Sequence, residues 1–453
     1  MITANTQEER KHFYKLVFSL VLPMALQNLI NVGVSTADVV MLGKVGETSL
    51  SASSLAGQVQ FIMFLILFGL TSGAGVLTAQ YWGKKDIRTI EKVMGMAMLI
   101  ALIIAVLFTA VVLLFPYDVM AIFSKEEDVI KEGVLYLRII AISYIFTAMT
   151  LIYLNVMRSI ERVIISTVVY LVSLIVNVIL NAILIFGMFG LEPMGIRGAA
   201  IATLIARIVE FIIVLFYSKF KNKDVRFRLK DLIPHDKLLM KDFIKYSLPV
   251  LANELVWGAG TSTSAAIIGH LGKAAVAANS ITQVTRQLAM IVSFGLAGAT
   301  AILIGKAIGE NDEDRARLYA KRFVKLSIIF GIIGAFVILG VSLVAKDMLS
   351  LSDQAKSYMS FMMFVMSYFA FGQSFNSVVV VGVCRAGGDT KFGLYLDAGF
   401  LWGVSVFLGF IAAFVLKLPV PLVYMVLISD EIVKMPVTYR RYKSMKWLKN
   451  VTR

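Results

Sequence analysis

The sequence predicts an all-α, polytopic membrane protein with twelve transmembrane helices, arranged as two parallel six-helix repeats. Composition, the length of the apolar runs and an internal repeat lead to this prediction. Of the 453 residues, 58% are hydrophobic and 16% are charged, whereas soluble domains are about 45–50% apolar and about 25% charged. A soluble chain of this composition could not cover its surface with polar groups, so we expect the protein to lie in a lipid bilayer.

Twelve apolar stretches have the length of about 20 residues that a helix needs to cross a bilayer. They lie near residues 16–41, 50–79, 93–115, 134–157, 163–189, 196–217, 243–269, 276–305, 323–345, 357–383, 392–416 and 419–439. Backbone amides cannot stay unpaired in lipid, and these runs do not alternate every second residue, so we expect helices rather than barrel strands. Residues 1–14 are polar and charged, and we expect no cleaved signal peptide.

Lysine and arginine are distributed unevenly among the connections. The chain ends and the even-numbered connections hold most of them, above all the connection at 219–245. Because cytoplasmic connections of membrane proteins accumulate these residues, both termini are expected in the cytoplasm, which requires an even number of spans. The same rule accounts for the net charge of +15 without a nucleic-acid partner.

The chain repeats itself after 226 residues, and proline and glycine positions coincide without gaps. The matching landmarks are Leu22-Pro23 with Leu248-Pro249, Gly43 with Gly269, Phe68-Gly69-Leu70 with Phe294-Gly295-Leu296, and Gly83 with Gly309. Six spans per half bring both halves into the membrane in the same direction. Such parallel repeats are typical of secondary transporters, whose substrate site lies between the repeats.

We therefore predict an N-lobe at residues 1–218, an inter-lobe linker at 219–242 and a C-lobe with a cytoplasmic tail at 243–453. The linker region is rich in lysine, and its apolar residues have a spacing that suits a helix lying on the cytoplasmic surface. A plain solvated linker fits the same residues equally well.

Polar side chains inside the spans are the candidate functional residues, since a carboxylate at mid-bilayer depth costs roughly 2.5–3.5 kcal/mol. In the first span, Gln27, Asn31, Ser35 and Asp38 share one helical face. In the seventh span, Glu254 and Thr261 also share one helical face, and Trp257 lies one turn from Glu254. A polar face on a membrane helix must contact water or the protein interior. The alternative interpretation is that these residues serve only to pack one helix against another.

Three further polar residues could surround Asp38. Asn177 and Asn181 lie four residues apart in the fifth span, and Thr203 follows a run of small residues in the sixth. Such an oxygen-rich surrounding would suit a proton on Asp38 or a bound Na⁺ ion, and the sequence does not separate the two. Arg207 and Glu210 are expected to form a local ion pair.

Several motifs, in order, resemble those of multidrug and toxic compound extrusion (MATE) transporters. Pro23, Asp38 and Met41-Leu42-Gly43 resemble their first-span signature, and Gly198-Ala199-Ala200-Ile201-Ala202-Thr203 resembles their fifth-to-sixth span segment. Arg385-Ala386-Gly387-Gly388-Asp389-Thr390 resembles the motif after their tenth span. The resemblance covers nearly the whole chain. It departs at the tenth span, where Ser374 stands at the position of an acid that some members carry.

The resemblance implies an antiporter of the cell (inner or plasma) membrane that exports cationic or amphiphilic small molecules in exchange for H⁺ or Na⁺. It implies ion coupling at Asp38, Asn177, Asn181, Thr203 and Glu254, with Na⁺ able to bind at Asp38 or Glu254 and no other cofactor or metal. We expect a monomer that moves its substrate by alternating access. The expected substrate cavity contains Gln27, Asn31, Ser35, Trp257, Thr261, Tyr368, Gln373 and Asn376.

Two other functions compete with this interpretation. A lipid-linked oligosaccharide flippase of the same superfamily would need a more cationic cavity than these acids provide. A membrane-embedded transferase would need a metal-binding or nucleophilic motif that we do not find in the sequence. We therefore predict a secondary active transporter and not an enzyme.

Overall fold

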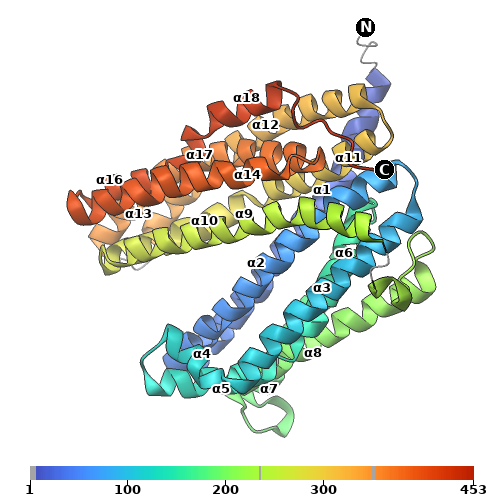
Figure 1. Ribbon diagram of the computed structural model, residues 1–453. Helices are drawn as coiled ribbons and strands as arrows, with labels where there is room; N and C mark the ends of the chain where they lie inside the picture. The colour runs from blue at the N-terminus through green and yellow to red at the C-terminus, as the bar shows by residue number, and fades with distance from the viewer. Residues whose placement is uncertain (1–6, 234–235, 349–351) are drawn as a thin grey trace. The chain divides into compact units, whose positions relative to one another are not determined.

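The computed structural model describes residues 7–233, 236–348 and 352–453, and their regular structure is helical (Figure 1). In the first half the helices are α1 (Gln7–Val45), α2 (Glu47–Gly83), α3 (Ile87–Leu114), α4 (Pro116–Phe123), α5 (Glu127–Ile140), α6 (Ser143–Ser159), α7 (Ile164–Phe186), η1 (Met188–Gly190), α8 (Gly195–Phe216), η2 (Tyr217–Lys221) and η3 (Leu229–Leu232). The second half holds α9 (Lys237–Gly269), α10 (Lys273–Ala289), α11 (Ile291–Gly309), α12 (Glu313–Met348), α13 (Asp353–Asn376), η4 (Ser377–Cys384), α14 (Thr390–Leu396), η5 (Asp397–Val406), α15 (Phe407–Phe410), η6 (Ile411–Val415), α16 (Val420–Leu427), α17 (Asp430–Val433) and α18 (Met435–Lys443).

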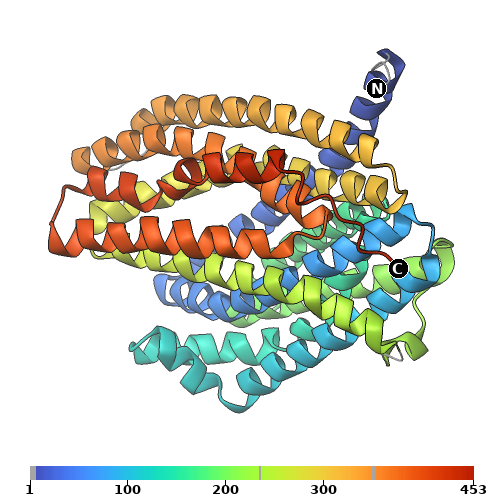
Figure 2. The same ribbon diagram turned by 45° about the horizontal axis from the view of Figure 1, so that its top comes forward.

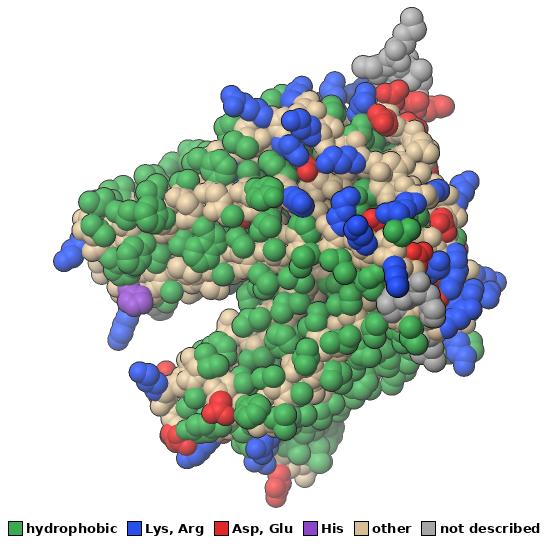
Figure 3. All heavy atoms as spheres, viewed as in Figure 1, with side chains coloured by type: hydrophobic (Ala, Val, Ile, Leu, Met, Phe, Trp, Pro, Cys, Tyr) green, Lys and Arg blue, Asp and Glu red, His purple; other side chains and the backbone are tan. Residues whose placement is uncertain are grey.

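The predicted all-helical membrane fold is confirmed. Among the described residues, nine helices are long and apolar enough to cross a membrane, and ten if the bent pair α5–α6 forms one span. The two other predicted spans fall on α9, which contains Asn253 and Glu254, and on the interrupted series α16, α17 and α18. On the surface, hydrophobic side chains cover the long helical faces, and Lys and Arg side chains gather mainly near helix ends (Figure 3).

Several predicted spans are broken where the apolar pattern gave no warning. The fourth span bends by 52° between Ile140 and Ser143. The eighth is divided at Met290 into α10 and α11. The eleventh and the end of the tenth contain wider π-type turns, at Asp397–Val406 and Ser377–Cys384. Such turns interrupt the regular ladder of helix hydrogen bonds and often accompany functional sites.

The chain forms two compact units. The first unit comprises residues 1–25, 75–85 and 245–453, and the second comprises 26–74 and 86–244. Helices α1 and α2, blue in Figure 2, and α9, yellow-green there, therefore each contribute residues to both units by their residue ranges. The division into lobes at residues 218 and 243 stays a prediction.

Inside the first unit, the end of α2 contacts the end of α11 through glycines that the repeat makes equivalent. A Cβ atom on Gly83 would lie 2.1 Å from the carbonyl oxygen of Lys306, and one on Gly309 would lie 1.8 Å from that of Gln80. Because Gln80 and Lys306 are themselves 226 residues apart, the contact is reciprocal. Two-fold related surfaces produce such reciprocal contacts, as expected of parallel repeats.

In the second unit, the connection after α8 lies against α3 as a strap, residues 222–232. Arg88 forms a two-pronged ion pair with Asp231 and holds the pKa of that carboxyl below its usual range. Glu91 accepts a hydrogen bond from the backbone of Arg226 at 2.9 Å. A Cβ on Gly95 would lie 2.1 Å from the carbonyl oxygen of Asp231, so glycine permits the close approach.

The strap is not a freely solvated linker, because the Arg88–Asp231 and Arg226–Glu91 contacts hold it against α3. Its helical residues are the four of η3, while the apolar spacing that suggested a surface helix continues through Leu238, Leu239 and Phe243 in the first turns of α9. Helix α9 begins at Lys237, six residues before the predicted start of the seventh span, and buries Leu239 and Phe243.

Candidate ion and substrate sites

The structure brings together four of the five predicted ion-coupling residues. Asn181 on α7 donates a hydrogen bond to the Asp38 carboxylate at 2.5 Å and a second one to Asn177 at 3.1 Å. Asn177 donates in turn to the hydroxyl of Thr203 on α8 at 3.2 Å. One continuous chain of polar groups therefore connects α1, α7 and α8 inside the second unit.

Local sequence explains how α8 reaches this chain. A Cβ on Gly198 would lie 2.7 Å from the backbone of Leu184, so only glycine lets α8 approach α7 so closely. Asn177 and Asn181 lie one helical turn apart on the same buried face of α7. Small residues are what close packing of membrane helices requires.

The side chain oxygen of Asn181 gives the site a free acceptor. Within the described part of the chain, this buried Oδ1 atom has no hydrogen-bond partner. A buried acceptor without a partner is costly. A proton on Asp38 or a small cation bound beside it would provide the missing partner, and the amide, carboxylate and hydroxyl oxygens suit a hard cation such as Na⁺.

Arg207 does not neutralise Asp38 directly. As predicted, it pairs with Glu210 one turn away on α8, at 2.5 Å. No salt bridge between Arg207 and Asp38 occurs within the described residues. The carboxylate of Asp38 therefore has a neutral hydrogen-bond donor and no direct ionic partner, which leaves it able to bind a cation.

The other residues of the first-span stripe have different surroundings. Gln27 is buried and donates to the backbone of Val163 and the hydroxyl of Thr167, at 3.2 and 2.9 Å, so it ties α1 to the start of α7. Asn31 and Ser35 are exposed, and the Ser35 hydroxyl bonds to the backbone oxygen of Asn31. Only these last two are free to contact a substrate in this conformation.

Glu254, the fifth predicted coupling residue, is bound to an arginine. Arg385 donates to its carboxylate at 2.8 Å and to the side chain of Asn253 at 2.9 Å. Arg385 begins the motif that resembles the segment after the tenth span. Because Glu254 and Arg385 lie 131 positions apart, no local pattern in the sequence connects them.

The predicted cavity residues of the second half have separate surroundings. Tyr368 is 57% exposed and lies edge-on against Phe364. Trp257 and Thr261 are half-buried on α9. Gln373 is buried and accepts a hydrogen bond from Arg286 at 3.0 Å. Asn376, also buried, is hydrogen-bonded to Glu431, and we return to it below.

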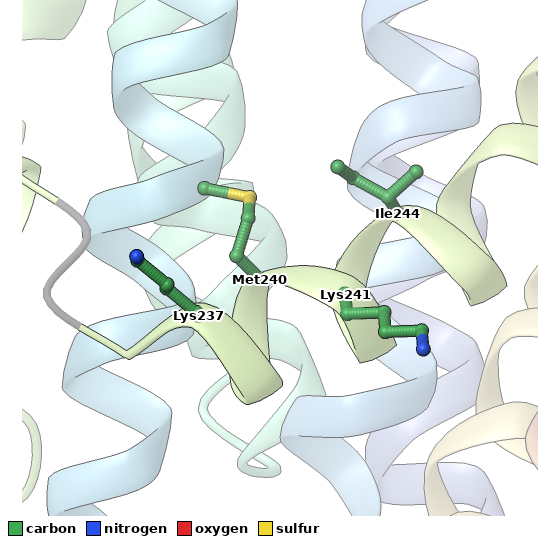
Figure 4. Close-up of a pocket in the computed structure, with 4 residues that line it drawn as sticks. All are labelled: Lys237, Met240, Lys241 and Ile244. Carbon is green, nitrogen blue, oxygen red and sulfur yellow. The ribbon is translucent and has the colours of Figure 1, made fainter.

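Two hollows in the described part of the chain lie away from these residues. One of about 430 Å³ is lined by four side chains of α9, Lys237, Met240, Lys241 and Ile244 (Figure 4). A second, of about 470 Å³, is lined by residues between Leu114 and Arg138. None of the predicted site residues lines either hollow.

Comparison with known proteins shows which protein family this chain matches. A family model described as MatE matches the chain twice, at residues 23–183 and 249–411. The two matches begin 226 residues apart, in agreement with the internal repeat. An uncharacterized transporter of Bacillus subtilis, YisQ, is 22% identical and covers 95% of this chain and 94% of its own length. A probable multidrug resistance protein of the same organism, YoeA, is 24% identical and covers 99% and 97%.

Solved structures show the same fold. A Vibrio cholerae MATE transporter, VcmN, solved as a mutant, superposes with a TM-score of 0.87 at 18% identity, covering 97% of this chain and 98% of that one. An outward-facing multidrug resistance MATE transporter of the MOP superfamily gives a TM-score of 0.84 at 18% identity, with coverage of 95% and 96%.

Proposed function

Because this chain belongs to the MatE family of multidrug efflux transporters, we propose that it is an antiporter that exports cationic or amphiphilic small molecules in exchange for H⁺ or Na⁺. Secondary transport, rather than enzymatic catalysis, is the activity of the family. The proposal depends above all on one observation: Asp38 lies in the membrane-spanning helix α1, is hydrogen-bonded by Asn181 and has no ion-pair partner among the described residues.

Exchange requires that the ion and the substrate favour different conformations. An ion shifts the equilibrium between two conformations only by its difference in affinity for them. A proton or Na⁺ on Asp38 would satisfy the free oxygen of Asn181 and hold α1 against α7 and α8. The ion-free carboxylate would favour the conformation that binds a cationic substrate.

Glu254 is proposed as a second coupling group, under the control of Arg385. An incoming proton or Na⁺ must displace the guanidinium that now contacts the carboxylate at 2.8 Å. Asp38 needs no such displacement, so we expect it to dominate coupling.

The substrate cavity is proposed to use Gln27, Asn31, Ser35, Trp257, Thr261 and Tyr368, together with Gln373 and Asn376. The two aromatic side chains would attract a cation that lies within about 6 Å of the ring. The chain is proposed to act as a monomer that moves its substrate by alternating access.

Dye efflux from proteoliposomes tests the function, with a pH gradient and a Na⁺ gradient imposed separately. Asp38→Asn keeps the size of the side chain and removes its charge, so gradient-driven efflux should fall to the level of protein-free liposomes. Asp128→Asn, an exposed acid at the start of α5, is the control and should keep the wild-type rate. Undiminished efflux by Asp38→Asn would remove Asp38 from the mechanism.

A further inference from the structure

Three carboxylates surround a single lysine in the first unit, away from Asp38 and outside the predicted coupling site. Lys434 contacts Asp430 at 3.2 Å and Glu431 at 2.9 Å, both on α17, and Asp397 at 3.2 Å, at the start of η5. We call these four residues the Lys434 cluster. The distances make all three carboxylates direct neighbours of one ammonium group.

The cluster is buried and its charges do not balance. The Lys434, Asp430 and Glu431 side chains are 5%, 6% and 7% exposed, and Asp397 is 14% exposed. With every group ionised, three negative charges would face one positive charge. A buried charge without a partner costs so much free energy that the group neutralises instead, and adjacent carboxylates therefore share protons.

The neighbouring arginines leave an excess of negative charge. Arg385 is paired with Glu254, so this pair adds no net charge, and the amide of Asn253 donates to Asp397 at 2.6 Å. Arg286 on α10 donates its hydrogen bonds to the neutral side chains of Gln283 and Gln373, so its positive charge acts on Glu431 only at a distance. Even with Arg286 counted, three carboxylates stand against two cations, and Ser405, which is hydrogen-bonded to Asp430, is neutral.

Asn376 extends the cluster as a buried neutral group. It is 3% exposed, and its amide nitrogen donates both to the carboxylate and to the backbone oxygen of Glu431, each at 2.7 Å. The backbone carbonyl holds the amide with its nitrogen toward Glu431. The amide therefore positions the Glu431 carboxylate but adds no charge to balance it.

We propose that the Lys434 cluster holds an exchangeable proton and is a second protonation site of the transporter, separate from Asp38. Uptake forms an O–H bond between a carboxylate oxygen and a proton from water; release breaks that bond and returns the proton to water. A proton is favoured over a metal ion, since no metal-binding group of three acids, histidines or cysteines occurs in the described part of the chain. Its role in coupling rests on the proposed antiport.

Proton uptake by purified protein in nanodiscs tests the inference without a gradient or substrate. We would change the pH in small steps and measure uptake with an indicator dye in Asp38→Asn protein, then in the same protein with Glu431→Gln added. The second substitution should reduce uptake by about one proton per molecule, as expected when one titrating group is removed. Asp38→Asn with Glu210→Gln is the matched control: Glu210 has its own arginine and should leave uptake unchanged.

Infrared spectroscopy of Asp38→Asn protein, in which Asp38 cannot contribute, provides a measurement that does not depend on folding of the Glu431→Gln variant. At neutral pH we expect a protonated carboxyl band that shifts in D₂O and disappears at high pH. Absence of the band, or equal uptake with and without Glu431→Gln, would overturn the inference and leave the Asp38 proposal intact. Undiminished dye efflux by Asp38→Asn would instead overturn the Asp38 proposal and leave proton uptake by the cluster standing.

Discussion

Asn181 is the residue that gives Asp38 its surroundings. Its amide nitrogen holds the carboxylate at 2.5 Å and the side chain of Asn177 at 3.1 Å, so it sets the position of both. Some members of the family carry an acid where this chain has Asn181. A second carboxylate there would repel Asp38 unless a cation bound between them. Asparagine avoids that repulsion, and a single charge is therefore available for exchange.

Asn181→Ala should weaken binding of the coupling ion without removing it. A hydrogen bond to a charged group contributes roughly 1.5–3 kcal/mol, which corresponds to about a tenfold to hundredfold change in affinity. The measurement is the ion concentration that gives half-maximal dye efflux. Thr36→Ala is the control, because the Thr36 hydroxyl bonds to the backbone of its own helix at Val32. Equal half-maximal concentrations in the two variants would contradict the role of Asn181.

At the scale of elements, the reciprocal contact between α2 and α11 shows what the repeated glycines do. Gly83 and Gly309 are equivalent positions of the two repeats. Because neither has a side chain, the backbones of α2 and α11 can come into contact there. Gln80 then reaches past them, donating to the backbone oxygen of Ala386 at 2.7 Å and accepting from the backbone of Val451 at 2.8 Å. The end of α2, the segment after η4 and the C-terminal tail are thereby joined.

Gly309→Leu should separate these elements. Its Cβ would collide with backbone rather than with a flexible side chain, and overpacking of this kind costs about 1–3 kcal/mol. The melting temperature of the purified protein should therefore fall. Gly340→Leu on α12 is the matched control, because a Cβ there meets nothing within 4 Å. Equal melting temperatures for both variants would show that the glycine contact is not needed.

At the scale of the whole molecule, charge and apolar surface together determine how the chain lies in a membrane. Long apolar helices alternate with connections whose lysine and arginine content is high on one side. The predicted orientation, with both termini in the cytoplasm, follows from that bias. The structure adds that α1 begins beside α12, where Phe13 contacts the rings of Tyr319 and Phe323. The N-terminal segment is thus in contact with the start of α12, and both are predicted on the cytoplasmic side.

Cysteine labelling of intact cells tests this orientation. The chain has one cysteine, Cys384, which is buried and should not react. A membrane-impermeant maleimide should label Lys125→Cys, on the outer connection, in intact cells. It should label Lys223→Cys, in the strap, only after the membrane is permeabilised. The reverse pattern would show that the charge rule assigns the wrong orientation to this chain.

Features that depend on composition and on residues close together in the chain could be predicted from the amino-acid sequence. Apolar runs of membrane length predicted the helices, the 226-residue repeat predicted two similar halves, and a spacing of three residues predicted the Arg207–Glu210 pair. Each of these follows from helix periodicity or from the absence of water in lipid. The polar stripe containing Asp38 was found in the same way.

Contacts between residues far apart in the chain depend on how the helices pack and could not be predicted in this way. Asp38 and Asn181 are separated by 143 positions, and Glu254 and Arg385 by 131, so no local pattern relates them. For the same reason, the sequence did not predict that the strap packs on α3. It also did not predict that negative charge exceeds positive charge around Lys434, to which Asp397 is contributed by another helix. Helix periodicity gives the face on which a side chain lies, but packing between helices decides whether that face meets a donor, a cation or lipid.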